Sequence, residues 1–166
     1  MAQQFPRLVF DLFAGCGGLS LGLEKAGFSP ALVCELDDHA RSTYLRNRDF
    51  LIGKHKFNTL PELHFGAVDT ITNKSLKTVM GRLKVAYNLD QNPDIDLVVG
   101  GPPCQGYSGI GHRRSYGVEK KELPSNRLFE PMVDLIRKVR PKVFLFENVK
   151  GILSGRWTKE GNKGEI

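Results

Sequence analysis

Cys104 is the residue whose type and position best suit covalent chemistry. It stands in Asp96–Ser108 (DLVVGGPPCQGYS), after the apolar run 97–99 and the turn Gly-Gly-Pro-Pro. The apolar run is typical of a buried strand, and the glycines and prolines predict that this strand stops abruptly. A thiol held on so rigid a turn is placed for nucleophilic attack rather than for packing. We therefore predict that Cys104 is a catalytic nucleophile.

Three acidic residues, Glu35, Asp69 and Glu147, have the same kind of position as Cys104. The predicted strands that they follow are 31–34, 65–68 and 142–146. Glu35 lies about 20 residues after a glycine-rich turn, where an acid can bind ribose hydroxyls. The alternatives are a carboxylate at a helix N-terminus for Glu35 and an ordinary turn aspartate for Asp69.

The glycine-rich turn lies near the start of the sequence. The predicted strand 7–13 leads into Ala-Gly-Cys-Gly-Gly at 14–18, and a helix follows that ends at Gly27. A strand, a glycine turn and a helix in this order let the backbone approach a nucleotide-like ligand closely. The spacing differs from the Gly-x-Gly-x-x-Gly of dinucleotide binding, and a tight turn without a ligand explains these glycines about as well.

These segments belong to an alternating order of strands and helices. Apolar periodicity predicts strands at 7–13, 31–34, 65–68, 95–99 and 142–146, with a helix after each of the first four. Such an order calls for a parallel sheet with helices on both faces and ligands at the carboxyl ends of the strands. The glycine turn, Cys104 and the three acids all fall at that edge. Their agreement favours a functional site over a set of unrelated turns.

Length and composition fit one domain and set few limits on its function. The chain has 166 residues, 40% of them hydrophobic, which suffices for one sizeable core. No apolar run approaches the roughly 18 residues of a membrane span, and no secretory pattern opens the chain, so we expect a cytoplasmic protein, or a nuclear one in a eukaryote. Three widely spaced cysteines predict neither a disulfide framework nor a zinc site. The net charge of +6 suits an anionic partner such as nucleic acid, although many basic proteins bind none.

A long polar loop follows Cys104. Residues 105–124 contain several glycines and the basic residues Arg113 and Arg114. A loop of about twenty residues inside a compact domain is usually a functional lid or a disordered segment. The two arginines suit contacts with phosphates, and a solvated charged loop explains them equally well.

Several short motifs together resemble one enzyme family. They are Asp11–Gly18 (DLFAGCGG), Glu35, Asp69, Gly101–Gln105 (GPPCQ) with Ser108, and Glu147–Val149 (ENV). The set resembles the front half of the catalytic domain of cytosine-C5 DNA methyltransferases, in family order over about 140 residues. The combination of Pro-Pro-Cys-Gln with Glu-Asn-Val is highly specific, because amino-directed DNA methyltransferases carry Pro-Pro-Tyr where this chain has Cys104.

The resemblance implies a role for each matching residue. The residues expected to bind S-adenosylmethionine are Phe13, Gly15, Gly17, Glu35, Leu36, Asp69 and Pro103. Glu35 would hold the ribose, and Asp69 with Leu36 the adenine, although the family often has an aromatic residue at the position of Leu36. Cys104 would be the nucleophile, and Glu147 would hydrogen-bond a flipped-out cytosine. Contacts with DNA are expected from Gln105, Ser108, Arg113 and Arg114, and no metal is expected.

The chemistry of cytosine explains these residue types. C5 of the ring is too weak a nucleophile to take a methyl group directly from a sulfonium. Addition of a thiolate at C6 makes C5 an enamine carbon that can attack the methyl group, and a carboxyl group near N3 stabilises the adduct. Loss of the C5 proton then expels the thiol, and cysteine is both a good nucleophile and a good leaving group. The target base is stacked in a duplex and must first be flipped out, at a cost of a few kcal/mol.

No residues after Val149 match the later parts of the family's domain. Those parts are an arginine-bearing motif, a variable target-recognition region and a last helix that closes the cofactor site. The expected fold is an α/β, Rossmann-like S-adenosylmethionine-dependent methyltransferase fold that is truncated after the fifth strand and has an exposed sheet edge. We expect residues 1–166 to form one partial catalytic domain without the target-recognition region. We expect a fragment, or a subunit of a split enzyme, whose partners are double-stranded DNA and a complementing C-terminal half. No membrane partner is expected.

Three other functions fit parts of the same pattern. An RNA-directed cytosine-C5 methyltransferase, acting for example on tRNA, would carry the same motifs around Cys104 and Glu147. A non-catalytic regulatory module could keep the fold, although intact Cys104 and Glu147 argue against it. A nicotinamide enzyme would need the glycine spacing that this chain lacks.

Overall fold

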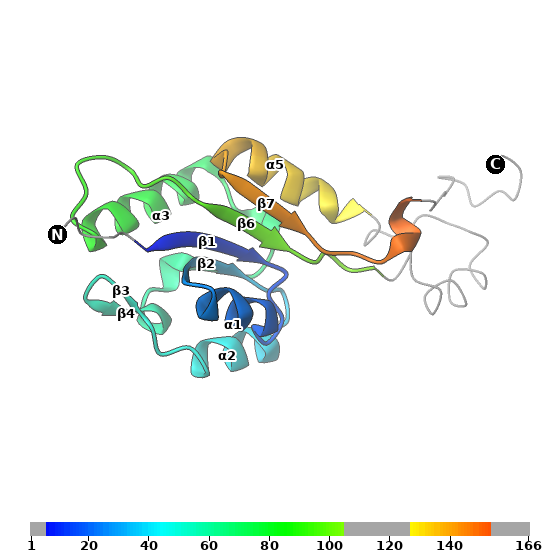
Figure 1. Ribbon diagram of the computed structural model, residues 1–166, viewed down its shortest axis with the longest axis horizontal. Helices are drawn as coiled ribbons and strands as arrows, with labels where there is room; N and C mark the ends of the chain where they lie inside the picture. Colours follow the sequence, from blue (N-terminus) through cyan, green and yellow to red (C-terminus); the bar gives the residue numbers. More distant parts are fainter. Residues whose placement is uncertain (1–5, 105–126, 154–166) are drawn as a thin grey trace, which may run out of the picture.

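The protein folds around a five-stranded parallel sheet with the strand order β5-β2-β1-β6-β7 (Figure 1). The computed structural model describes residues 6–104 and 127–153. The strands are β1 (Arg7–Leu12), β2 (Phe28–Cys34), β5 (His64–Phe65), β6 (Leu97–Gly100) and β7 (Val143–Phe146). After β1, the chain adds β2 and β5 on one side of it, and then β6 and β7 on the other. The strand order therefore reverses between β1 and β6, and parallel α/β sheets bind their ligands at such a point.

Helices cover both faces of this sheet, as the alternating sequence pattern predicts. Helices α1 (Gly18–Lys25) and α2 (Asp38–Arg46) lie on one side, and α3 (Asn73–Ala86) and α5 (Phe129–Val139) lie on the other (Figure 1). The short antiparallel hairpin of β3 (Leu51–Ile52) and β4 (His55–Lys56) forms a separate sheet. The 3₁₀ turns are η1 (Phe57–Thr59), η2 (Pro61–Leu63), η3 (Val68–Thr70) and η5 (Lys150–Leu153). Among the residues that the structure describes, no helix combines the length and apolar character that a bilayer span needs.

The third strand of the main sheet differs from its prediction. The sequence predicts a strand at 65–68 that ends at Asp69, whereas β5 contains only His64 and Phe65. Only the last two residues of β2 pair with β5. The chain then turns, and the backbone of Thr70 donates a hydrogen bond to the carbonyl of Ala67 at 3.1 Å. Asp69 consequently lies in a 3₁₀ turn beyond the sheet and not at a strand end.

Apolar side chains pack on both faces of the central strands. The main cluster includes Phe10 and Leu12 of β1, which are fully buried with Leu83 of α3 and Met132 of α5. A smaller cluster on the other face joins Val9, Leu97 and Val99 to Leu23 and Phe28. These clusters fix the sheet order and therefore bring the carboxyl ends of β1, β2 and β6 together.

Strand β7 is apolar and exposed, unlike the central strands. Val143, Phe144, Leu145 and Phe146 are 60%, 59%, 46% and 37% exposed. Successive side chains point to opposite faces, so both faces of β7 lack cover. Within the described residues β7 pairs only with β6, which makes it an edge strand. A long run of exposed apolar residues on a sheet edge is the kind of surface that proteins normally cover.

Candidate active site

The glycine turn forms a tight connection between β1 and α1. Phe13, Gly15 and Gly17 have φ angles of 57°, 55° and 88°. Such angles are easily adopted by glycine but rare for a residue such as Phe13. Gly17 precedes α1 without a side-chain cap, and its amide donates to the carbonyl of Ala14 at 2.9 Å. A non-glycine residue in a left-handed conformation is a feature that concentrates at ligand sites.

Glu35 links the glycine turn to the end of β2. Its Oε2 accepts a hydrogen bond from the amide of Gly15 at 2.7 Å, and its Oε1 accepts one from the amide of Asp37 at 2.8 Å. The cap of α2 is Asp37, whose Oδ1 accepts from the amide of Ala40 at 2.8 Å, and this hydrogen bond lowers the pKa of Asp37. Glu35 is therefore not the cap of the helix, and its carboxylate points back to the glycine turn.

A cleft of about 810 Å³ opens at this edge of the sheet. Of the seven residues predicted to bind the cofactor, five line it: Phe13, Glu35, Leu36, Asp69 and Pro103. The amide of Gly15 is hydrogen-bonded to Glu35, which lines the cleft, and Gly17 is buried in the turn. Leu36 is 74% exposed, so it offers an apolar surface at the rim. Two further carboxylates, Asp37 and Asp38, also line the cleft and make it acidic.

The ends of β6 and β7 bring Glu147 beside the segment that carries Cys104. The amide of Glu147 donates to the carbonyl of Gly100 at 3.0 Å. A Cβ atom added at Gly101 would lie 2.7 Å from Oε2 of Glu147, so the carboxylate lies against the glycine backbone. Cys104 is half-buried and Glu147 is exposed. Both residues therefore lie near the end of the β6–β7 pair, and Pro103, next to Cys104, lines the same cleft as Glu35.

The sequence reasoning missed several residues of this site. Asn148 donates from Nδ2 to the carbonyl of Pro102 at 3.0 Å and so ties the end of β7 to the segment before Cys104. Leu128 and Pro131, at the start of α5, line the cleft. The Glu-Asn-Val motif contained a signal for Asn148, but the contact depends on two strands that are far apart in sequence.

Four predicted DNA-contacting residues, Gln105, Ser108, Arg113 and Arg114, lie outside the described residues. Within residues 6–104 and 127–153, no group of three or more histidines, cysteines or acids could hold a metal ion.

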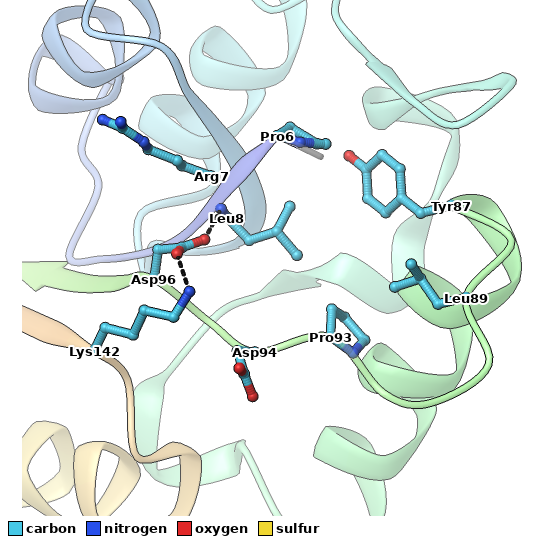
Figure 2. Close-up of a pocket in the computed structure, with 9 residues that line it drawn as sticks. All are labelled: Pro6, Arg7, Leu8, Tyr87, Leu89, Pro93, Asp94, Asp96 and Lys142. Atoms are coloured by element: carbon cyan, nitrogen blue, oxygen red, sulfur yellow. Dashed lines mark hydrogen bonds and ion pairs between the residues drawn. The ribbon is translucent and has the colours of Figure 1, made fainter. Parts of the chain in front are cut away.

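A second, smaller cleft of about 240 Å³ lies at the amino ends of the strands, away from the site (Figure 2). At its edge Asp96 accepts hydrogen bonds from the amide of Leu8 and from Nζ of Lys142, both at 2.8 Å. The hydrogen bond and charge of Asp96 raise the pKa of Lys142. These contacts join the beginnings of β1, β6 and β7, so Asp96 is a structural clamp and its charge is already paired.

The parallel sheet, its reversal point and the cleft beside the glycine turn define a Rossmann-like α/β protein of the class that binds nucleotide-like ligands. The chain belongs to the C-5 cytosine-specific DNA methylase family, whose family model matches residues 8–163. The resemblance stated from the motifs and the expected fold class are both confirmed.

Several curated relatives are type II methyltransferases. The chain is 36% identical to M.DdeI of Desulfomicrobium norvegicum over 146 residues. This matched region covers 88% of this chain and 28% of the relative. It is 35% identical over 147 residues to M.XorII of Xanthomonas oryzae, covering 88% of this chain and 29% of the relative. The match with M.FnuDI of Fusobacterium nucleatum is 32% over 151 residues, 91% of this chain and 35% of the relative. The chain thus spans about a third of the length of these relatives.

Solved structures share the fold. A structure described as a DNA modification methyltransferase of an E. coli prophage matches with a TM-score of 0.59 and 31% identity, over 88% of this chain and 33% of that chain. The Dnmt2 methyltransferase of S. pombe matches with a TM-score of 0.53 and 18% identity, over 93% of this chain and 37% of that chain. The second similarity shows the fold alone.

Proposed function

We propose that this chain supplies the cofactor site and the nucleophile for methyl transfer from S-adenosylmethionine to C5 of cytosine in DNA. The observation that supports this proposal is the shared edge of the sheet. One cleft there contains Phe13, Glu35 and Asp69, and Glu147 lies against the backbone three residues before Cys104. The proposal extends the family membership to the activity of this chain.

The residues of the cleft fit S-adenosylmethionine. The carboxylates of Glu35 and Asp69 provide acceptors for the hydroxyl and amino groups of a nucleoside, and the acidic lining suits a ligand that carries positive charge. Phe13 and the exposed Leu36 offer apolar surface for the adenine ring. The cofactor supplies an electrophilic methyl group when bound. Glu35, Asp69 and Phe13 would hold it in the cleft, which Pro103, after the end of β6, also lines.

Cys104 and Glu147 would act on the cytosine ring. The thiolate of Cys104 forms a bond to C6 while the C5=C6 electron pair moves to C5, and Glu147 hydrogen-bonds the ring at N3 and the 4-amino group. This electron pair would let C5 bond to the methyl carbon that a cofactor held by Glu35 and Asp69 would supply, as the carbon–sulfur bond of that cofactor breaks. A base takes the C5 proton, the double bond re-forms, and the thiolate of Cys104 leaves. The cytosine must lie outside the stacked duplex for these steps, so it must first be flipped out.

We also propose that activity needs the part of the domain that the relatives carry outside the matched region. The chain spans 28%, 29% and 35% of the three relatives described above. The exposed apolar residues of β7 provide the surface on which that part would dock, by adding a strand at the edge and apolar cover on both faces. Whether it belongs to the same polypeptide or to a second one, its contact with β7 completes the sheet next to Glu147.

Adduct trapping tests the nucleophile and the substrate together. A chimaera would carry this chain in place of the matched region of M.DdeI and would be incubated with S-adenosylmethionine and a duplex containing 5-fluorocytosine. Fluorine at C5 blocks the final elimination, so a covalent protein–DNA adduct should accumulate. Cys104→Ser should abolish the adduct. An equal yield with Cys104→Ser would overturn the proposal, and methylation of tRNA in place of duplex DNA would overturn the DNA substrate.

A further inference from the structure

A buried polar network lies directly beneath the glycine turn. Its four members come from different segments: Asp11 from β1, Ser20 from α1, Tyr44 from α2 and Arg48 from the chain just after α2. Their exposed fractions are 1%, 0%, 0% and 6%. Burying charged side chains carries a large desolvation cost, and apolar residues would fill the same space at a lower one. The network therefore calls for a role other than packing.

One branch of the network is a chain of hydrogen bonds that ends at a carboxylate. The hydroxyl of Ser20 donates to Oδ2 of Asp11 at 2.5 Å. Because Ser20 has a single proton to give, the hydroxyl of Tyr44, at 2.8 Å, must donate to Ser20 when Asp11 is ionised. Oδ1 of Asp11 is buried and has no hydrogen-bond partner among the described residues. The ionised state of Asp11 thus sets the donor and the acceptor in both hydrogen bonds, from Tyr44 to Ser20 and from Ser20 to Asp11.

The other branch holds the turn itself. Nη2 of Arg48 donates a hydrogen bond to the carbonyl of Gly17, and its Nε forms an ion pair with Oε1 of Glu24 at 2.8 Å. The guanidinium also lies 5.2 Å from the ring centre of Tyr44. A Cβ atom at Gly17 would come within 2.6 Å of Cδ2 of Tyr44 and 2.8 Å of Nη2 of Arg48. The turn therefore rests on Tyr44 and Arg48 without any free space.

The opposite side of the same turn faces the cleft, where the amide of Gly15 donates to Glu35. The turn is thus held between Glu35 and the network. We propose that Asp11, Ser20, Tyr44 and Arg48 are positioning residues that hold the glycine turn in the shape required for binding an adenosyl cofactor. This proposal rests on the proposed function, because it assigns the network to the cofactor site.

The charge of Asp11 gives this role a pH dependence. Burial raises the pKa of Asp11 to about 6, although the hydrogen bond of Ser20 and the charge of Arg48 lower it. The other titratable groups that face Asp11 are Glu24, Glu35, Cys34 and Tyr44. When Asp11 gains a proton, the network loses the negative charge opposite Arg48 and the fixed direction of its hydrogen bonds. Cofactor affinity should therefore fall as the pH drops through about 6, and Asp11→Asn should remove that dependence.

The experiment combines three measurements on the full chain and its variants: calorimetric titration with S-adenosylhomocysteine, amide NMR spectra of the turn glycines, and thermal unfolding. Tyr44→Phe removes one hydroxyl and keeps the ring, and Arg48→Lys keeps the charge and loses the planar guanidinium. Each should raise the Kd about ten-fold, the effect of losing one buried hydrogen bond to a charged network, and shift the amides of Gly15 and Gly17. The matched controls Tyr87→Phe and Arg46→Lys, both away from the turn, should keep the original Kd and spectra.

Each outcome decides one of the two proposals. If the variants bind S-adenosylhomocysteine as tightly as the original chain, or if Kd changes only in proportion to a lowered unfolding temperature, the positioning role is wrong. If neither the original chain nor its chimaera with M.DdeI binds the ligand although the turn amides respond to Tyr44→Phe and to pH near 6, the network does shape the turn and the cofactor assignment is wrong. A raised Kd with an unchanged unfolding temperature supports both.

Discussion

Asp11→Asn perturbs a carboxyl group that the fold buries beneath the glycine turn. The carboxyl of Asp11 is 1% exposed, and desolvation raises its pKa from 3.8 to about 6. An acid with a raised pKa binds its proton more tightly in the folded protein than in the unfolded chain. Between those two pKa values the folded state holds more protons, so the free energy of unfolding decreases as the pH rises through this window and stays constant above it.

The size of the effect follows from the two pKa values. Each pKa unit corresponds to about 1.4 kcal/mol, so ionised Asp11 lowers the stability of the folded protein by roughly 3 kcal/mol above pH 6. Roughly half of this change falls between about pH 5 and about pH 7.5. Asparagine does not ionise, so the free energy of unfolding of the original chain, taken relative to Asp11→Asn, should fall by about 1.4 kcal/mol over that interval.

Urea unfolding at both pH values measures this difference. At any one pH, the difference in the free energy of unfolding between the two proteins also includes the cost of burying the new amide. The prediction therefore concerns how that difference changes with pH. Ser20→Ala provides an independent check, because loss of its hydrogen bond should raise the pKa of Asp11 further and extend the slope to higher pH. An original chain and an Asp11→Asn variant that respond identically to pH would refute the argument that Asp11 is buried as a carboxylate.

Three further substitutions test the geometry of the strand ends. Gly100→Ala should destabilise the fold by about 1–3 kcal/mol in urea unfolding, because the added Cβ would lie 2.9 Å from a backbone carbonyl oxygen of β1; an unchanged midpoint would show that the strands are not so close. Gly101→Ala should leave the stability nearly unchanged and lower methyl transfer by the chimaera with M.DdeI, since the only close contact among the three that its Cβ would make with Glu147 is with the movable carboxylate, at 2.7 Å, the other two being ordinary contacts at 3.7 Å. Asp96→Ala should cost about 1 kcal/mol of stability by leaving the amide of Leu8 without its acceptor, and should lower the pKa of Lys142, measured by NMR titration; a Lys142 pKa that does not change would disprove the clamp.

The parts of the site that the sequence could predict depend on local patterns. The glycine turn and Glu35 each follow an apolar strand, and parallel pairing of those strands was enough to predict that they meet. Asp69 was predicted at a strand end and instead occupies the turn Val68–Thr70, because β5 pairs with only two residues of β2. It still lines the cleft.

The parts that escaped prediction depend on contacts between distant segments. Arg48 and Gly17 are 31 positions apart, and Asn148 and Pro102 are 46 apart. No periodicity marks such a pair, because each partner alone resembles an ordinary surface residue. Arg48 was not distinguishable from its exposed neighbour Arg46 by sequence, yet it is 6% exposed under the turn.

The position of Glu147 would connect the proposed completion of the sheet to the proposed reaction. Glu147 directly follows β7, and its backbone amide donates a hydrogen bond to the carbonyl of Gly100 across the β6–β7 pair. Any movement of the exposed edge strand therefore moves the carboxylate relative to the segment that carries Cys104. A neighbouring strand would add main-chain hydrogen bonds on the free side of β7 and apolar cover on Phe144 and Leu145. The same contact that covers the apolar edge would thereby fix the distance between the two groups, Cys104 and Glu147, that we propose act on one cytosine ring.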